Sequence, residues 1–365
     1  MNVCIIGDGL TSQYFAKNLI NKKINVDIYS EKKINNLSEN RTIGISKENF
    51  DFFNKEILKI QKKYFWEIKK IKIYSEKLKN GEILNFKKKK ENLFLMIKNR
   101  ELYKLLINKL LKSKFFKYKI IKKNNFYQKI INEKKYDLII NCNSKNFIAR
   151  KYFSKKIDKK YNNFAYITIL KHETINNKTA IQIFTQNGPI AFLPISNKET
   201  SVVYSVDFNK DKFDEKKIID LIKKHNPKFI IKKIDKVNKF ELGFSNLRNY
   251  YYQNILAFGD SLHKVHPLAG QGFNMIIRDI KAISQIIQTK IDLGIQLDAS
   301  IFEEFEKKTK HVNFIFSNSI DSIYELFNFD KQFENKNFNK LLRILGKNKS
   351  LKFFFIKYAD KGFDI

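Results

Sequence analysis

GDSLHKVHPLAGQG, residues 259–272, is the most informative segment of this 365-residue chain. It holds three of the 12 glycines, two of the five histidines and one of the four prolines. Glycine and proline gather where the backbone must adopt dihedral angles, or approach other atoms closely, in ways that other residues do not allow. A short apolar run at 255–258 precedes the segment, and isoleucines at helical spacing follow it as far as Gly294, a residue typical of a helix C-terminus. The pattern predicts a strand, a glycine-rich turn and a helix.

The N-terminus shows the same order of elements. The predicted elements are a buried strand at 3–6, a turn at 7–9 (GDG), a helix at 10–20 and a strand at 26–29. In such a strand–helix–strand unit, a Gly-x-Gly turn lets backbone N–H groups approach a pyrophosphate, and the helix N-terminus adds favourable partial charge. One interpretation is a dinucleotide site at Gly7 and Gly9, with Ser12 in the place of a third glycine. A purely structural turn is the other.

An acidic residue after the second strand of such a unit accepts hydrogen bonds from the ribose hydroxyls of the dinucleotide. Glu31 is the nearest candidate, although Ser30 stands at the expected position one residue earlier. We therefore predict Glu31 as the ribose ligand and keep Ser30 as the alternative.

The middle of the chain is rich in predicted strands. Alternating or β-branched apolar runs lie at 165–170, 180–185, 190–195 and 201–206. They predict a sheet inserted between two nucleotide-binding portions, while residues 50–66 have a helical pattern. The predicted fold class is α/β, with a Rossmann-like nucleotide-binding domain, an inserted mixed β-sheet domain and C-terminal helices. The expected bounds are 1–70, 96–155 and 240–300 for the first, 71–95 and 156–239 for the second, and 301–365 for the helices.

Charge and composition limit the classes of partner. A net charge of +34 suggests nucleic acid or an anionic membrane. The basic residues, however, are 65 lysines and only six arginines, scattered along the chain. Nucleic-acid binders usually combine arginine clusters, which fork onto phosphates, with aromatic side chains that stack on bases. The composition therefore argues against a nucleic-acid partner.

Cysteines and apolar runs limit the compartment. Cys4 and Cys142 are too few for a disulfide framework or a four-ligand zinc site, so two buried thiols are expected. No uninterrupted apolar run approaches the roughly 20 residues that cross a bilayer, and the N-terminus lacks a secretory signal pattern. We expect a soluble cytoplasmic protein.

Residues 259–274, together with Arg278-Asp279, resemble the second FAD motif of the flavin-dependent aromatic hydroxylases. The resemblance implies that Asp260 hydrogen-bonds the ribityl chain or its surroundings, and that the proline-containing loop lies against the isoalloxazine ring. The helix that follows would stabilise the negative charge of a reduced flavin. In this segment the candidate FAD-binding residues are Gly259, Asp260, Gly270, Gln271, Gly272, Phe273 and Asn274. His266 and Pro267 are the catalytic candidates, and no metal site is expected because the histidines lack further ligand partners.

Three shorter segments extend the resemblance. Residues 184–194 resemble a signature of the ubiquinone-biosynthesis branch of these hydroxylases, and a turn between two strands is the alternative. Residues 40–46 (NRTIGIS) place Arg41, and residues 99–102 (NREL) place Arg100, where the family approaches FAD. An ordinary helix start is the alternative for the last of these.

One segment departs from the family pattern. Asn143-Ser144 stands where the family carries Asp-Gly, although Arg150 fits the arginine that follows. Loss of that carboxylate would affect the geometry around the FAD diphosphate or the transient NAD(P)H site to which the motif is linked.

The resemblance implies a p-hydroxybenzoate hydroxylase-like fold with a Rossmann-like FAD-binding domain, and an FAD-dependent NAD(P)H:O2 monooxygenase. NAD(P)H would reduce the flavin, and a C4a-hydroperoxide formed with O2 would hydroxylate the ring of a polyprenylated phenol in ubiquinone biosynthesis. The implied partners are that phenol, O2, a membrane surface and other ubiquinone-pathway proteins. Residues 351–358 (LKFFFIKY) would lie peripherally on the inner face of the cytoplasmic membrane, and packing on the core is the alternative.

Three other functions stay open. A flavoprotein reductase or halogenase on the same scaffold would bind FAD and hydroxylate no phenol. A non-catalytic FAD-binding scaffold would show no NAD(P)H oxidation stimulated by a phenolic ligand. A basic nucleic-acid-binding protein with an incidental Rossmann-like turn would bind with steep salt dependence and without flavin.

Overall fold

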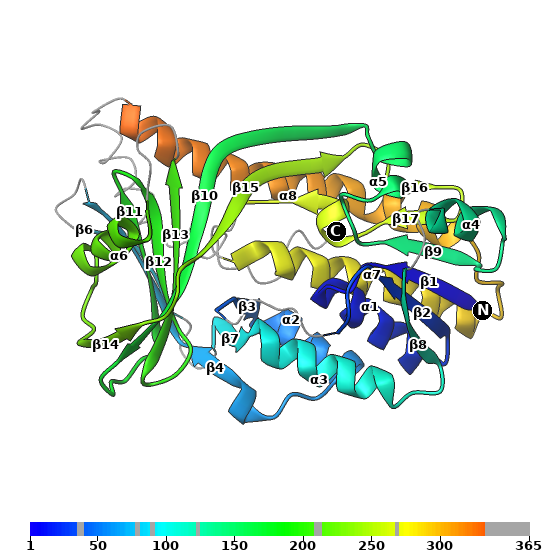
Figure 1. Ribbon diagram of the computed structural model, residues 1–365, viewed down its shortest axis with the longest axis horizontal. Coiled ribbons are helices and arrows are strands. Elements are labelled where there is room, and N and C mark those ends of the chain that lie inside the picture. Colours follow the sequence, from blue (N-terminus) through cyan, green and yellow to red (C-terminus); the bar gives the residue numbers. More distant parts are fainter. Residues whose placement is uncertain are drawn as a thin grey trace.

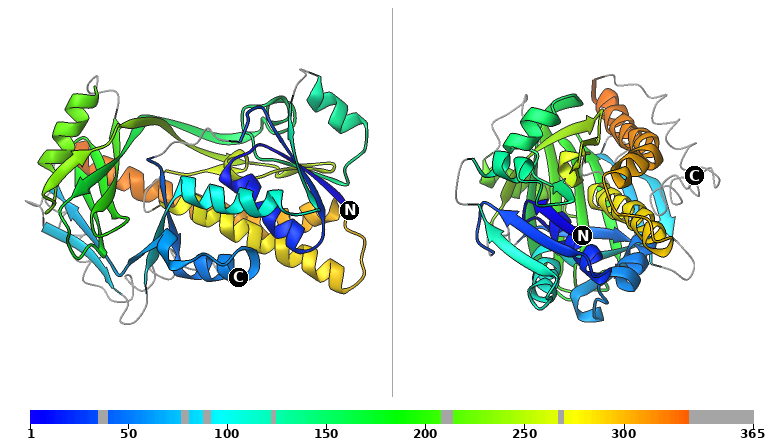
Figure 2. Two further views of the ribbon diagram at one scale, coloured as in Figure 1. Left: turned by 60° about the horizontal axis from the view of Figure 1, so that its bottom comes forward. Right: turned by 90° about the vertical axis from the view of Figure 1, so that its right-hand side faces the viewer.

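The residues that the structure describes fold around three β-sheets. The computed structural model describes residues 1–34, 40–76, 81–87, 92–121, 125–207, 214–266 and 270–332. A six-stranded sheet lies at the end of the molecule that holds the N-terminus, a nine-stranded sheet lies at the opposite end, and long helices run between them (Figure 1, Figure 2). A three-stranded sheet completes the fold. The predicted α/β class with an inserted sheet is confirmed.

The six-stranded sheet contains the predicted strand–helix–strand unit. Its strands, in spatial order, are β16 (Tyr251–Tyr252), β17 (Ile255–Ala257), β9 (Leu138–Asn141), β1 (Asn2–Ile6), β2 (Asn25–Ser30) and β8 (Phe116–Ile120). β9 pairs in parallel with both β1 and β17. The carboxyl ends of β1 and β17 therefore reach the same edge of the sheet, although they are far apart in the sequence.

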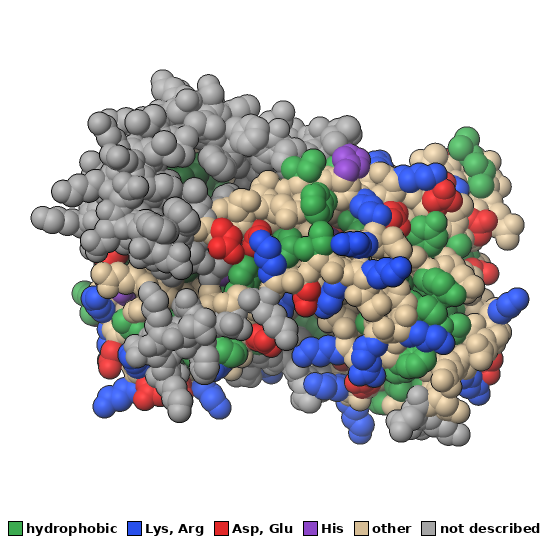
Figure 3. Space-filling model, turned by 90° about the horizontal axis from the view of Figure 1, so that it is seen from above, with side chains coloured by type: hydrophobic (Ala, Val, Ile, Leu, Met, Phe, Trp, Pro, Cys, Tyr) green, Lys and Arg blue, Asp and Glu red, His purple; other side chains and the backbone are tan. Residues whose placement is uncertain are grey.

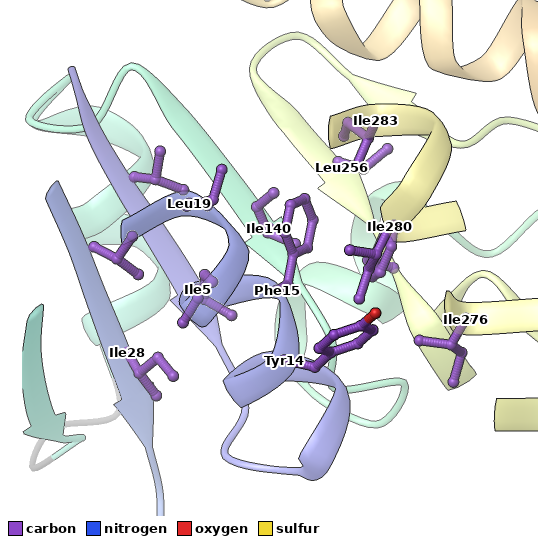
Figure 4. Close-up of a cluster of buried hydrophobic side chains, with 14 of the residues drawn as sticks. Ile5, Tyr14, Phe15, Leu19, Ile28, Ile140, Leu256, Ile276, Ile280 and Ile283 are labelled. Carbon is purple, nitrogen blue, oxygen red and sulfur yellow. The ribbon is translucent and has the colours of Figure 1, made fainter. Parts of the chain in front are cut away.

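Helices cover this sheet with apolar side chains. They include α1 (Leu10–Asn21), α3 (Asn99–Leu111), α4 (Phe126–Asn132), α5 (Phe147–Tyr152), α7 (Gln271–Asp292) and α8 (Ser300–Gln332). In α1, buried Leu10, Tyr14 and Phe15 recur at helical spacing and so form one apolar stripe. Figure 4 shows side chains from β1, α1, β9, β17 and α7 pointing toward one another, and burial of each large one stabilises the fold by about 1.5–3 kcal/mol.

The nine-stranded sheet forms the other end. Along its main path the strands are β18 (His263–Lys264), β15 (Asn238–Leu247), β10 (Lys156–His172), β13 (Glu199–Asp207), β12 (Gly188–Pro194), β11 (Thr179–Thr185), β5 (Lys70–Ser75) and β6 (Gly81–Lys87). β14 (Ile231–Ile234) pairs with β10, and α6 (Glu215–Lys224) packs on the sheet. β18 and most of β15 fall in the range 240–300 and yet pair in this sheet, and the domain bounds stay predictions.

The three-stranded sheet lies between the other two and consists of β3 (Thr42–Ser46), β7 (Phe94–Lys98) and β4 (Phe65–Ile68). The helix predicted over 50–66 is wrong beyond Ile57. α2 (Lys47–Phe52) continues as a π-helical turn (Phe53–Ile57), Leu58 is extended, and only a 3-10 turn (Lys62–Tyr64) precedes β4. Pairing of β4 with β7 and donation from Trp66 Nε1 to the carbonyl of Asn177 at 2.6 Å override the helical pattern.

Two expectations concern segments of the chain that the structure does not describe. Pro267 and residues 351–358 lie outside the described residues. Across the ranges that are described, none of the helices combines the length and apolar character needed to cross a membrane.

Candidate functional site

The two glycine-bearing bends meet at one edge of the six-stranded sheet. Ile6 of β1 and Ala257 of β17 both pair with Asn141 of β9, so the three chains leave the sheet side by side. Gly259 has φ +65°, and a Cβ there would lie 2.7 Å from Cγ2 of Thr11. The first turn of α1 is thus in contact with the second glycine-bearing bend, residues 259–272. This contact leaves no room for a side chain at position 259.

Gly7, in the first glycine-bearing bend, packs closely against the residue that follows β9. Its φ is +114°, a value that L side chains rarely adopt, and a Cβ would lie 3.4 Å from the Cβ of Cys142. Its amide donates to the carbonyl of Tyr29 at 2.8 Å. Ser12, which replaces a third glycine, is buried beside Gly7 and still fits, because its small side chain leaves α1 close to the sheet.

Two helix N-termini begin at these bends. α1 starts after Gly9 and α7 starts after Gly270, and in the described part of the chain no side chain caps either helix and neither first turn contains an acidic residue. The N-terminus of each helix therefore carries partial positive charge that no acidic side chain of its first turn offsets. A Cβ on Gly9 would meet no described atom within 4 Å, so the backbone there is open to a ligand. This arrangement fits an anionic diphosphate such as that of FAD.

Asn274 fastens the start of α7 to the three-stranded sheet. It is fully buried, and its Oδ1 accepts from the amide of Ser46 at 2.9 Å. Its Nδ2 donates to the carbonyl of Gly44 at 2.9 Å, and Asn49 also donates to Oδ1 at 3.0 Å. Asn274 thus positions the α7 N-terminus, a role that sequence reasoning did not assign because its partners lie more than 200 residues away. A direct contact of Asn274 with FAD stays a prediction.

Neighbouring residues of this motif also have defined places. Gln271 is buried and Gly272 is half-buried in the first turn of α7. The ring of Phe273 lies 6.3 Å from the ring of Tyr14 and so packs α7 against α1.

Two arginines predicted from separate motifs lie at the same end of the three-stranded sheet. β3 and β7 are antiparallel, and the amide of Asn99 donates to the carbonyl of Arg41 at 2.9 Å. Arg100 is the next residue after Asn99 and is half-buried, whereas Arg41 is exposed. The backbone therefore brings together two of the six side chains that can bind phosphate in a forked geometry.

Glu31 follows β2 and is exposed. Tyr127 of α4 donates its hydroxyl hydrogen to Glu31 Oε1 at 2.9 Å. Burial and this carboxylate raise the pKa of Tyr127, so the phenol stays protonated and keeps its hydrogen bond. Ser30 is buried, and its Oγ accepts from the amide of Lys32 at 3.0 Å. Of the two candidate ligands of the ribose, Glu31 has an exposed side chain and Ser30 has a buried one.

The segment that departs from the family pattern forms a turn held by amide side chains. Asn143 Oδ1 accepts from the amide of Lys145 at 2.9 Å, and Asn146 caps α5 by accepting from Ala149 N at 2.9 Å. An aspartate at 143 could accept the same hydrogen bond. The loop therefore keeps a turn without the carboxylate, and Arg150 is exposed on α5.

Cys142 is a member of the site that sequence reasoning treated only as a buried thiol. Burial raises its pKa to about 12, the hydroxyl of Ser12 opposes this, and the negative charge of Asp260 adds to it. Asp260 itself is exposed. The sequence holds no local signal for this role, because the place of Cys142 at the site follows from the pairing of β9 with β1.

The two histidines of the second bend have different surroundings. His263 is buried, with Nε2 2.5 Å from Asp279 Oδ2, and Asp279 Oδ1 accepts from Asn313 Nδ2 at 2.8 Å. His266 is also buried, and its ring lies edge-on to the ring of Tyr161 of β10 at 5.7 Å. His263 thus belongs to a polar cluster that joins β18, α7 and α8, and a catalytic role of His266 stays a prediction.

Comparison with known sequences agrees with this geometry. The family model described as an FAD binding domain matches residues 151–292. The mitochondrial ubiquinone biosynthesis monooxygenase COQ6 of Dictyostelium discoideum is 26% identical over 186 residues, which are 41% of this chain and 38% of that protein. The COQ6 of Caenorhabditis elegans is 24% identical over 214 residues, or 47% of this chain and 48% of that protein. The chain thus spans less than half the length of these curated relatives.

Comparison with solved structures covers nearly the whole chain. p-Nitrophenol 4-monooxygenase PnpA of Pseudomonas putida superposes with a TM-score of 0.76 at 10% identity, covering 100% of this chain and 98% of that one. PqsL of Pseudomonas aeruginosa, a probable FAD-dependent monooxygenase, gives a TM-score of 0.71 at 13% identity, covering 94% and 99%. These likenesses establish the p-hydroxybenzoate hydroxylase-like fold. In sequence and in fold the chain is thus similar to flavin-dependent aromatic hydroxylases, and the curated relatives that match are ubiquinone biosynthesis monooxygenases.

Proposed function

We propose that this chain is an FAD-dependent monooxygenase that hydroxylates the aromatic ring of a polyprenylated phenol in ubiquinone biosynthesis, with NAD(P)H and O2 as co-substrates. The observation that carries the proposal is the contact between Gly259 and Thr11, which brings both glycine-bearing bends to one edge of the sheet. The names of the relatives, ubiquinone biosynthesis monooxygenases, support the substrate class.

The residues at this edge have complementary proposed roles. Bound FAD would supply the redox chemistry, and the protein would bind and orient it. The N–H groups after Gly9 would hold the diphosphate, Glu31 would accept from the ribose, and the α7 N-terminus would stabilise negative charge on the flavin. Arg41 and Arg100 would add positive charge near the phosphates, since both lie at the end of the three-stranded sheet.

A small apolar cluster supports a substrate side between the second bend and the nine-stranded sheet. Its buried members are Met275 of α7 and Phe316 and Ile320 of α8. Tyr161 of β10, Phe184 of β11 and Val265 of the second bend pack against them. These side chains would exclude water from the reacting ring, which protects the hydroxylation from hydrolytic side reactions.

Location follows from the proposed substrate. A polyprenylated phenol resides in a membrane, so we propose a peripheral position on the inner face of the membrane, within reach of other ubiquinone-pathway proteins. The relatives that match are named as mitochondrial proteins.

The absorption spectrum of the purified protein tests the cofactor. A flavin spectrum, and NAD(P)H oxidation that a phenolic ligand stimulates, are the expected results. Analysis of the quinone intermediates in a strain that lacks individual ring hydroxylases then identifies the product. Protein that is colourless and takes up no FAD under native conditions contradicts the proposal.

A non-catalytic FAD-binding scaffold is the second candidate, favoured by Asn143-Ser144 in place of the family's Asp-Gly. Asn143→Asp tests it, because the new carboxylate retains the acceptor for Lys145 N. A scaffold binds FAD, yet shows no phenol-stimulated NAD(P)H oxidation in the unmodified protein. Gain of that oxidation in Asn143→Asp would assign the loss to this position.

The distribution of charge gives less support to nucleic-acid binding. On the face in Figure 3, the lysine and arginine side chains that are drawn in colour lie scattered among acidic and apolar ones. A groove that follows a phosphate backbone needs a continuous positive track.

A further inference from the structure

An open groove lies on the nine-stranded sheet, at the end of the molecule away from the six-stranded sheet. Residues of α6 and β14 line it, and its volume is about 510 Å³; Figure 1 shows both elements at this end of the molecule. The apolar part of its wall includes Ile219, Phe229 and Ile231, which are buried or half-buried. Lys223, Lys232 and Lys233 also line it and are exposed. The groove, defined here as the α6–β14 groove, thus has an apolar floor and a cationic rim.

The positive charge of this rim is only partly compensated. In the described part of the chain, no acidic side chain lines the groove. The ammonium of Lys232 lies 3.8 Å from a carboxylate oxygen of Glu173, a long ion pair on the surface that contributes little. Nearby, burial and the positive charge of Lys72 lower the pKa of Lys228. The groove therefore faces solvent with a positive potential and attracts anions.

A large aliphatic side chain stands beside the groove. Ile230 is 66% exposed, between the lining residues Phe229 and Ile231. The wall is fixed, because Ile218 and Ile222 on the other side of α6 are fully buried in the core of the sheet domain. Lysine stems can lie along an apolar surface while their ammonium groups point outward. An exposed isoleucine beside such lysines is therefore complementary to a surface that is both acidic and amphiphilic.

We propose that the α6–β14 groove docks this protein on a bilayer that contains acidic phospholipid. The rim lysines would meet the phosphate headgroups, and Ile230 would enter the interface between headgroups and acyl chains. A nucleic acid fits less well, because the groove offers lysines without arginine and its one aromatic residue, Phe229, is buried. The proposal goes beyond the proposed hydroxylation and does not depend on it.

Sedimentation of the full-length protein with vesicles tests the groove. One set contains phosphatidylcholine alone and the other contains phosphatidylglycerol as well, with no phenolic compound in either. Each lysine at an anionic membrane contributes about fivefold to binding, so Lys223→Gln/Lys233→Gln is expected to weaken binding to acidic vesicles about 30-fold. The matched control is Lys104→Gln/Lys109→Gln, which removes the same charge from exposed positions on α3 and is expected to change binding less than threefold.

Ile230→Ser separates the apolar contact from the charge. Loss of this side chain from the interface is expected to weaken binding about tenfold without changing its dependence on salt. If the groove variant and the control variant lose the same amount of vesicle binding, the attraction is a general effect of charge and the proposal is overturned. The proposal is also overturned if the unmodified protein does not bind acidic vesicles. Soluble polyglutamate provides a further comparison. If Lys223→Gln/Lys233→Gln weakens the binding of polyglutamate and leaves the binding of vesicles unchanged, the groove is assigned to an acidic protein instead. None of these measurements requires flavin or substrate, so their failure is distinct from failure of the hydroxylase proposal.

Discussion

The backbone of Gly259 lies against the side chain of Thr11, so close that a methyl group on Gly259 would stand 2.7 Å from Thr11 Cγ2. This contact joins the bend after β17 to the first turn of α1. Both segments leave the sheet beside β9, and the separation of the two bends is therefore set by the parallel pairing of three strands.

Gly259→Ala should separate the two bends and weaken FAD binding. The added Cβ meets Thr11, and the φ of +65° costs an alanine roughly 1 kcal/mol. We expect at least about tenfold weaker FAD binding in a fluorescence titration. Thr11→Ala in the Gly259→Ala background removes Cγ2 and should restore part of the affinity. An affinity that Gly259→Ala leaves unchanged would show that this contact does not position the cofactor.

Asn274→Ala should destabilise the protein by about 2–4 kcal/mol. It leaves the buried amide of Ser46 and the carbonyl of Gly44 without their partner, at roughly 1–3 kcal/mol each. Urea unfolding measures the loss. Asn108→Ala, an exposed position on α3, is the control and should change stability by less than about 0.5 kcal/mol. Similar values for the two variants would contradict a positioning role of Asn274.

The pair His263–Asp279 should show strong coupling. Both side chains are 1% exposed, and removal of one partner leaves the other buried without it. We expect Asp279→Ala to cost about 3–5 kcal/mol, and His263→Ala/Asp279→Ala to cost at least about 1 kcal/mol less than the sum of the single variants. Chemical unfolding of the four proteins gives the coupling energy, and additive losses would show that the contact contributes nothing specific.

The thiol of Cys142 should react slowly with thiolate-specific reagents. Its pKa is raised from 9.0 to about 12, so the folded protein favours the neutral thiol. At pH 9 the folded protein should react about a thousandfold more slowly than the unfolded chain, with a tenfold rise per pH unit up to about pH 12. The stabilisation from this group is complete below pH 9 and is lost as the pH rises to 12.

Cys142→Ser provides the control for this experiment, since Cys4 is fully buried, Cys142 is half-buried, and burial raises the pKa of both thiols. The residual reaction of this variant measures Cys4 alone. A native Cys142 that reacts as fast as the unfolded chain at pH 9 would show that the end of β9 is open to solvent.

Much of the fold was predictable because its turns demand particular residues. Glycines stand at 7, 259 and 270, where φ is positive, and so the sequence marks both bends directly. The register of β1, β9 and β17 was not predictable, because hydrogen bonds between parallel strands leave no local pattern. The π-helical turn and β4 replaced a predicted helix for a similar reason: the partner of Trp66, Asn177, lies 111 residues away.

For the candidate site, the sequence predicted which residues matter better than it predicted where they lie. Arg41 and Arg100 were selected from separate motifs, and only the pairing of β3 with β7 shows that they lie at the same place. Asn274 was predicted as a ligand of the cofactor, which stays a prediction, and the structure adds that its side-chain amide bonds to the backbone of β3. Motifs identify residue types that a site requires, but they do not separate residues that touch a ligand from residues that hold those in place.

The long strand β10 has a mechanical consequence for the molecule. It pairs with β15 on both sides of an irregularity between Lys160 and Phe164, and the same strand pairs with β13 deep in the nine-stranded sheet. The two ends of the molecule are thus connected by paired strands (Figure 1), with an irregularity in the pairing, and not by a single unpaired linker. A motion of one end relative to the other would have to bend these paired strands, and we expect the bend at the irregularity between Lys160 and Phe164, where the ladder is interrupted.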